Sequence, residues 1–145
     1  MISRTVTVVL DAPSADVFDF LSRVENLPAW ATDFARELKF ENGKPKVVNG
    51  LGEFYFRIDA NGDTGVIDMF AGPDESQMAI FPTRVIQLAP DKCAYTFTMF
   101  KAPQMTDDLF EAQHRSLVRE FENIRAHFSP AGRNCAAERE RTDGS

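Results

Sequence analysis

The chain has 145 residues, 43% of them hydrophobic, and its 16 Lys and Arg against 22 Asp and Glu give a formal net charge of −6. This length supports one sizeable hydrophobic core, and the acidic balance without a basic run argues against nucleic acid or anionic membranes as partners. No stretch approaches the roughly 20 apolar residues of a membrane span, and the start lacks the pattern of a signal peptide. We therefore expect a soluble, cytoplasmic protein with a single domain over residues 1–128.

The first predicted element is a strand over residues 2–10, whose β-branched residues alternate with a period of two. Two short helices are predicted next, over residues 14–21 and 25–29, followed by Trp30, the only tryptophan. Short helices in tandem do not form a core alone, so they should pack against one end of a sheet. Trp30 is then either an anchor between two elements or a platform for a ligand.

The next part of the chain is typical of antiparallel strands joined by tight turns. Asn42 and Gly43 end the first of these strands, residues 34–40, because both residues tolerate positive φ. The stretch 44–52 is ambiguous, since its proline and glycines fit an edge strand, a bulge or a bent strand.

A second Asn-Gly pair, at residues 61–62, predicts the clearest hairpin of the sequence, within residues 53–71. A two-residue turn at this pair places Phe56 opposite Ile67. This register places five apolar residues on one face of the hairpin: Phe54, Phe56, Ile58, Ile67 and Met69.

Two further strands are predicted over residues 77–88 and 93–100. Phe97 and Met99 are expected on the inner face of the sheet. The length of the loop between these strands is ambiguous, and a slip of one residue decides whether Arg84 faces solvent or the interior.

A long helix is predicted over residues 106–128, and the other elements are expected to be arranged around it. Its mainly apolar residues recur every three or four positions, which is the period of an α-helix and places them on one face. The members of this face are Phe110, His114, Leu117, Phe121, Ile124 and Phe128. Thr106 is suited to cap the helix. His114 either hydrogen-bonds a backbone carbonyl at the edge of the face or meets a polar group of a ligand.

The rest of the chain shows no signature of a metal or cofactor site. Its two histidines lie on one helix and its two cysteines have no paired spacing, so a multi-ligand metal site is not expected. Motifs for phosphate, dinucleotide, nucleophile-elbow or zinc-protease chemistry are absent. Residues 129–145 form a polar tail, expected to be disordered or to continue as a helix around residues 136–141.

The order of the elements and two local sequences resemble the START-like (SRPBCC, helix-grip) superfamily. The sequences are Leu10-Asp-Ala-Pro-Ser-Ala-Asp-Val-Phe-Asp-Phe-Leu21 with Asn26-Leu-Pro-Ala-Trp30 after it, and the closing helix from Met105-Thr-Asp-Asp-Leu-Phe110. Within that superfamily the chain resembles the polyketide cyclase/dehydrase and lipid-transport-like group, from residue 2 to about residue 128. The resemblance implies an α+β helix-grip fold, with a curved antiparallel sheet of six or seven strands around the long C-terminal helix. It also implies a cavity between sheet and helix that opens near the two short helices.

These features predict the binding of a small hydrophobic ligand, such as a lipid, a sterol or an aromatic polyketide, in that cavity. The predicted ligand-binding residues are Trp30, Phe54, Phe56, Met69, Phe97, Met99, Phe110, His114, Leu117 and Phe121. The alternative is an enzyme of the polyketide cyclase or dehydratase type with His114 as acid or base. Arg84 and Asp68 are the other groups that could serve, if their strands place them inside.

Two further roles stay open. A helix and sheet that close without a cavity would favour a structural or interaction module. The outer face of the sheet could also form a homodimer interface, through Tyr55, Val66 and Phe70.

Overall fold

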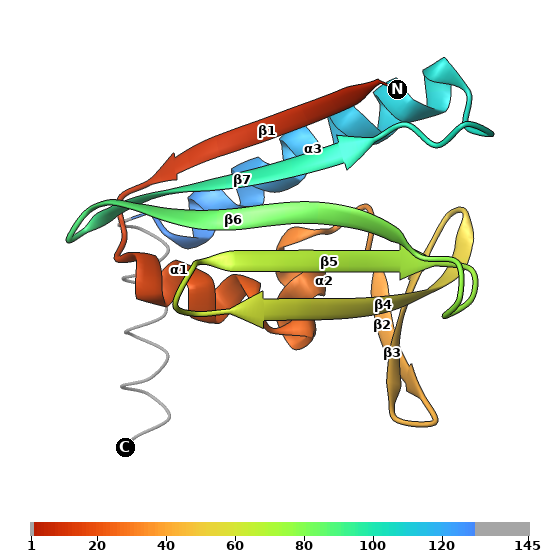
Figure 1. Cartoon of the computed structure of the whole chain (residues 1–145), viewed down its shortest axis with the longest axis horizontal. Helices are drawn as coiled ribbons and strands as arrows, with labels where there is room; N and C mark the ends of the chain where they lie inside the picture. The colour runs from red at the N-terminus through yellow and green to blue at the C-terminus, as the bar shows by residue number, and fades with distance from the viewer. Residues whose placement is uncertain (1, 130–145) are drawn as a thin grey trace.

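The computed structural model describes residues 2–129 and shows an open antiparallel sheet with helices on one face (Figure 1). Among these residues, seven strands lie in the order β1-β7-β6-β5-β4-β3-β2. The strands are β1 (Ser3–Leu10), β2 (Glu37–Glu41), β3 (Lys44–Asn49), β4 (Gly52–Asn61), β5 (Val66–Gly72), β6 (Ala79–Ala89) and β7 (Lys92–Phe100). The helices are α1 (Ser14–Leu21), the 3-10 turn η1 (Val24–Asn26), α2 (Leu27–Trp30) and α3 (Asp107–His127). The predicted α+β fold is confirmed, with a long C-terminal helix and short helices after the first strand.

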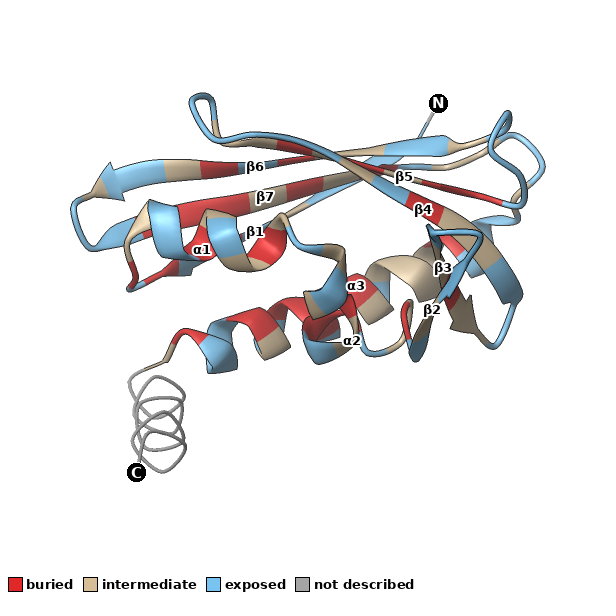
Figure 2. Ribbon diagram, turned by 90° about the horizontal axis from the view of Figure 1, so that it is seen from below, coloured by how far each residue is buried: buried red, intermediate tan, exposed pale blue. Residues whose placement is uncertain are grey.

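The long helix α3 follows its prediction. Thr106 caps its start, because the Thr106 hydroxyl accepts a hydrogen bond from the backbone N–H of Leu109 at 3.1 Å. The buried apolar residues of its predicted face are Phe110, Leu117, Phe121 and Ile124, with Phe128 just beyond the helix. Figure 2 shows α3 beneath the sheet, with buried residues along its length. Of the tail predicted over residues 129–145, only Ser129 lies within the described residues.

The short helices pack beneath one end of the sheet, as predicted. α1 covers the predicted residues, whereas the second predicted helix, residues 25–29, divides into η1 and α2. Val17 of α1 and Trp30 of α2 are buried, so both helices contribute to the core. At the far end of α3, the ring of His127 stacks on that of Phe20 of α1, with ring centroids 4.0 Å apart.

In the hairpin β2–β3 the predicted turn is confirmed, but the predicted start of β2 is not. Asn42 and Gly43 take positive φ, 55° and 77°, as the two-residue turn requires. The predicted strand start at residue 34 is wrong, because β2 begins at Glu37. Phe34 lies in the preceding loop, where its N–H bonds to the side chain of Glu120 on α3 instead of to a strand. The ambiguous stretch after the turn forms the regular strand β3.

The predicted register of the β4–β5 hairpin is wrong. Phe56 pairs with Ala71 instead of Ile67, a shift of four positions along β5, and Ile58 pairs with Met69. Because side chains alternate with a period of two, a shift by an even number leaves each residue on its predicted face. Phe56, Ile67 and Met69 are accordingly buried on the inner face, which is the face toward α3.

The shift arises because the Asn-Gly pair does not form the turn. Asn61 still belongs to β4, so the loop consists of residues 62–65. Gly65, and not Gly62, takes positive φ, 78°, and its N–H bonds to the backbone oxygen of Asn61 at 2.9 Å. The N–H of Val85 on β6 donates to the oxygen of Gly65 at 2.9 Å. A contact with a third strand therefore selects the longer loop.

We predict that Gly65→Ala destabilises the protein more than Gly43→Ala. Positive φ costs a residue with a β-carbon roughly 1 kcal/mol at either position. A β-carbon at Gly65 would also collide with the backbone oxygen of Val85, whereas at Gly43 it would meet open space. Urea unfolding should show a loss of about 3 kcal/mol for Gly65→Ala against about 1 kcal/mol for Gly43→Ala. Equal losses would contradict the role given to the β6 contact.

Candidate ligand-binding site

The inner face of the sheet is largely apolar from β1 through β7, β6 and β5 to β4, and it faces α3 (Figure 2). Its buried side chains are Val8, Leu10, Phe56, Ile67, Met69, Ala71, Val85, Cys93, Tyr95, Phe97 and Met99. Aromatic rings and thioethers supply much of this surface. The region between sheet and helix therefore offers mainly apolar and polarisable contacts.

Phe121 of α3 is the centre of an aromatic cluster between helix and sheet. Its ring centroid lies 5.4 Å from that of Tyr95, in stacked geometry. The rings of Phe97 and Trp30 meet Phe121 edge-on, at 6.2 Å and 6.4 Å. These separations are typical of favourable aromatic pairs. This Phe121 cluster brings together three predicted site residues and adds Tyr95, which the predicted site did not include.

The other predicted apolar residues surround this cluster. Four of them are buried in the same core: Met69, Met99, Phe110 and Leu117. Phe56 is buried against Phe34, with ring centroids 5.9 Å apart. Phe54 is only half-buried and pairs with Val47 of β3. Phe54 thus lies at the margin of the interior, away from the Phe121 cluster.

His114 lies at the edge of the α3 face and not in the aromatic cluster. Its side chain is 28% exposed, and its Nδ1 lies 4.0 Å from Oε2 of Glu111. The other oxygen of Glu111 binds Arg4 of β1, Nη2 to Oε1 at 2.9 Å. Among the described residues the imidazole makes no hydrogen bond. The structure thus does not provide the backbone carbonyl that the first interpretation of His114 required.

An open hollow of about 400 Å³ lies where the end of α1 and η1 face β3 and β4. Its lining residues are Ser22, Arg23, Val24, Glu25, Pro45, Phe56, Arg57 and Ile58. Phe56 and Ile58 belong to the inner face, so the hollow meets the apolar interior at β4. Of the ten predicted site residues only Phe56 lines this hollow, and no residue of α3 does.

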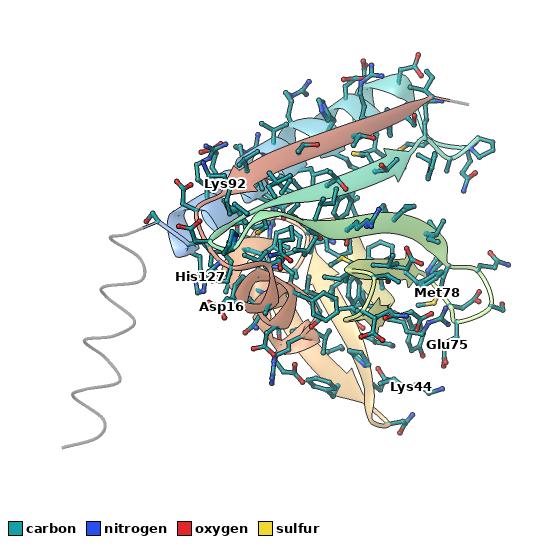
Figure 3. The ribbon with its side chains drawn as sticks, turned by 60° about the vertical axis from the view of Figure 1, so that its left-hand side comes forward. Asp16, Lys44, Glu75, Met78, Lys92 and His127 are labelled. Atoms are coloured by element: carbon teal, nitrogen blue, oxygen red, sulfur yellow. The ribbon has the colours of Figure 1, made fainter. Side chains whose placement is uncertain are left out.

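The pairing of β3 with β4 ends before Pro45, which lines the hollow. The two strands pair through residues 46–49 of β3. Continuing the register would place Pro45 opposite Phe56, but proline has no N–H for the strand ladder. Figure 1 shows β2 and β3 turning away from β4 and β5. An exposed ion pair, Lys44 Nζ to Glu75 Oε1 at 2.6 Å, joins β3 to the β5–β6 loop (Figure 3).

Glu120 of α3 is a buried carboxyl group that the predicted site did not include. It is 4% exposed, and its Oε2 accepts hydrogen bonds from the backbone N–H groups of Asp33 at 3.2 Å and Phe34 at 3.1 Å. Burial raises the pKa of Glu120 to about 7, with a smaller rise from the Asp33 charge, while the two N–H groups and Arg119 oppose the shift. Glu120 follows Leu117 by three residues, which places it on the buried face of the helix. This spacing could have predicted the burial of Glu120 from the sequence.

Two other side chains of α3, near Glu120, also bind the segment between α2 and β2 that contains Asp33 and Phe34. Asn123 Nδ2 donates to the backbone oxygen of Trp30 at 3.0 Å. Arg119 Nη2 lies 2.8 Å from Oδ2 of Asp33, and this guanidinium holds the pKa of the Asp33 carboxyl below its usual range. The segment that carries Phe34 onto Phe56 is therefore fixed from below by α3.

Tyr95 and Thr83 are two further polar groups inside the core. Tyr95 is fully buried and Thr83 is 3% exposed. The Thr83 hydroxyl donates a hydrogen bond to the backbone oxygen of Ile67 at 2.5 Å. Within the described part of the chain, the Tyr95 hydroxyl makes no hydrogen bond of standard geometry, and the Thr83 side chain is close enough to interact with it. Burial raises the pKa of Tyr95 well above its usual range, against a smaller opposite effect of the Thr83 hydroxyl, so this phenol stays neutral.

Arg84 and Asp68 point away from the interior. The sequence had left the direction of these two side chains open. Arg84 is exposed and alternates with buried neighbours on β6, and its Nε donates to the backbone oxygen of Thr64 at 3.2 Å. Asp68 alternates with buried neighbours on β5. Neither side chain lies on the inner face. Among residues 2–129, no three His, Cys, Asp or Glu side chains are grouped so that they could hold a metal ion.

The sequence matches no protein-family model and no curated protein. Solved structures do resemble the chain. A START superfamily protein from Mycobacterium smegmatis has a TM-score of 0.64 at 13% identity, covering 87% of this chain and 96% of that one. The Zhui aromatase/cyclase from a Streptomyces species has a TM-score of 0.65 at 18% identity, covering 90% and 99%. The Aha1 dimer from Colwellia psychrerythraea has a TM-score of 0.67 at 12% identity, covering 91% and 98%.

The chain therefore has the START-like fold that its sequence resembles, the fold that is also found in aromatase/cyclase proteins. The TM-scores of 0.64 to 0.67 establish the architecture, and a shared architecture does not fix an activity. No helix within the described residues is long and apolar enough to cross a membrane.

We predict that Glu120→Gln changes how stability depends on pH. The carboxyl has a pKa of about 7 in the folded chain against 4.5 as the ordinary value. The folded state therefore binds a proton more tightly than the unfolded state, and the wild type loses stability as pH rises from about 4.5 to 7. Glutamine still offers a carbonyl to the two N–H groups and does not titrate.

Urea unfolding between pH 5 and pH 8 provides the measurement. The stability of Glu120→Gln relative to wild type should rise across this range by on the order of 3 kcal/mol. Glu122→Gln, at an exposed position on the same helix, is the control and should leave the profile unchanged. Parallel profiles for wild type and Glu120→Gln would show that this carboxyl does not carry the raised pKa.

Proposed function

We propose that the protein binds a small apolar molecule between the inner face of the sheet and α3. The observation that supports this proposal is the hollow of about 400 Å³, which meets the apolar inner face at Phe56 and Ile58. Pockets that take small molecules are typically of this size. Four of the eight residues that line this hollow are apolar: Val24, Pro45, Phe56 and Ile58. Lipids, sterols and aromatic polyketides belong to the class of ligand that such a surface would accept.

The rim and the interior of this site differ in polarity. Arg23 and Arg57 lie at the rim, where Arg23 binds Asp19 at 2.9 Å and Arg57 lies over the ring of Phe70 at 4.2 Å. Further in, aromatic rings and the thioether of Met69 predominate, and methionine lets a wall adapt to different shapes. We infer a ligand that is neutral or carries a single polar group.

Binding is favoured over catalysis by the positions of the titratable groups. A cyclase or dehydratase needs an acid or base that can reach its substrate. Among the described residues, His114 lies at the margin of the core beside Glu111. Glu120 has a raised pKa, but its Oε2 is occupied by two backbone N–H groups of the α2–β2 segment. The enzyme alternative therefore rests on likeness of fold.

Homodimerisation through the outer sheet face stays a prediction of the sequence. The rings expected to be exposed there are partly covered, Tyr55 by Lys46 at 4.4 Å and Phe70 by Arg57 at 4.2 Å. Val66 is half-buried. These contacts make the outer face more polar than predicted.

We predict that Ile58→Trp reduces ligand retention and that Asp59→Trp does not. Ile58 lines the hollow, so a larger side chain there would occupy the proposed path to the interior. Asp59 is the next residue of β4 and is exposed. Native mass spectrometry of each purified protein, followed by organic extraction, measures the bound molecule. Equal retention by both variants, or no uptake from an apolar compound library by wild type, would contradict the proposed function.

A second prediction concerns His114. If this imidazole hydrogen-bonds the polar group of the ligand, His114→Leu should weaken binding roughly fivefold and lower the retained amount accordingly, since one hydrogen bond contributes about 1 kcal/mol. The matched control is His127→Leu, at the other histidine of the same helix. Unchanged retention in His114→Leu would exclude the anchor role and leave His114 as a residue at the edge of the helix face.

A further inference from the structure

The α2–β2 segment, residues 31–36, has little apolar packing of its own. It forms neither helix nor strand, and Phe34 within it is only half-buried. Its buried apolar side chains are those of Ala31 and Ala35, and an alanine side chain buries little surface. Segments with few buried apolar contacts open locally at a lower free energy than the core does.

Polar side chains from two elements hold this segment in place. Glu120 of α3 accepts the two backbone N–H groups described above. Asn123 of α3 donates through Nδ2 to the Thr32 hydroxyl at 3.1 Å. From the opposite side, Asn49 Nδ2 of β3 donates to the backbone oxygen of Phe34 at 2.9 Å. Of these three side chains, only Glu120 can gain or lose a charge.

Phe34 connects the segment to the hollow. The centroid of its ring lies 5.9 Å from that of Phe56, and Phe56 lines the hollow. Phe34 also packs against the hydrophobic core. Movement of the segment away from α3 would take this ring off Phe56 and uncover apolar surface where the hollow meets the interior.

The surroundings of Glu120 disfavour its charge while the segment lies in this closed position. The carboxyl is 4% exposed, and no other charged side chain is buried among residues 2–129. Burial raises the pKa of Glu120 to about 7, and the charge of Asp33 adds to the rise. Arg119 opposes this shift, but its side chain is 65% exposed and binds Asp33. Arg119 and Arg36 also lower the pKa of Asp33, so Asp33 stays ionised.

We propose that the α2–β2 segment is a gate beside the hollow, which stays closed while Glu120 is protonated and opens more readily when Glu120 ionises. Opening brings water to the carboxylate, so the ionised form favours the open segment. Ligand exchange is then slow at pH 5 and faster at pH 8. This inference rests on the proposed function and concerns the regulation of that site.

Amide hydrogen exchange followed by NMR measures the opening of the segment directly. After correction for the intrinsic exchange rate, the opening equilibrium at Asp33 and Phe34 should rise roughly 50-fold from pH 5 to pH 8, because the carboxyl has a pKa of about 7 when closed and 4.5 in water. Glu120→Gln should show no such rise. Glu122→Gln, at an exposed position on the same helix, is the control and should behave as wild type. A rise of equal size in Glu120→Gln would overturn the inference.

Two comparisons distinguish local opening from unfolding of the whole chain. In wild type, the Asp33 and Phe34 amides should exchange at least about tenfold faster than the slowest amides of β7, which exchange through global unfolding. Equal protection would overturn the inference, since the segment would then open only with the whole fold. Asn123→Ala removes one contact without changing the carboxyl, so it should increase opening at both pH values and keep the pH dependence. Unchanged opening in this variant would show that α3 does not hold the gate.

Uptake of Nile red, a neutral apolar dye, tests whether the gate controls the hollow. By stopped-flow fluorescence, uptake should be at least about tenfold faster at pH 8 than at pH 5 in wild type and independent of pH in Glu120→Gln. If the dye enters wild type at the same rate at both pH values, the gate is wrong and apolar binding stands. If the dye does not bind at either pH, the proposed function is contradicted, and the gate with it.

Discussion

The structure depends on the packing of α3 against the inner face of the sheet, where Phe121 is the centre of an aromatic cluster. Its ring contacts Tyr95 and Phe97 of β7 and Trp30 of α2, so one side chain joins the long helix to the sheet and to a short helix. Burying three aromatic neighbours around one ring contributes both apolar area and directional ring contacts. The sheet and the segment after α2 are thereby held in fixed positions relative to α3.

Glu120, the residue before Phe121, adds polar contacts between α3 and the α2–β2 segment to the aromatic packing of Phe121. The α2–β2 segment has backbone N–H groups that no strand satisfies, and a buried N–H without a partner is unfavourable. Glu120 accepts two of them, at Asp33 and Phe34, and its own burial raises the carboxyl pKa to about 7. The helix thus positions Phe34 against Phe56, beside the hollow. The same helix face serves the core and the border of the proposed site.

The hollow and the interior each contain a departure from regular structure. The pairing of β3 with β4 ends before Pro45, which lines the hollow beside α1 and η1. Tyr95 places a hydroxyl without a hydrogen bond of standard geometry among rings. A protein selected for stability alone would gain from a paired strand edge and an apolar residue at these two positions.

The sequence by itself determined the long helix and the inner face of the main strands. The spacing of Phe110, Leu117 and Phe121 predicted α3 correctly, and alternation in the strands placed Phe56, Met69 and Phe97 on the inner face, because both patterns depend on local backbone geometry. The tertiary structure decided what local geometry cannot: the β4–β5 register follows from the contact of Gly65 with Val85, and the burial of Glu120 follows from the N–H groups of a segment 86 residues away. Likewise, whether Tyr95 finds a hydrogen-bond partner depends on what the facing strands and α3 bring near it, and residue type alone does not carry that information.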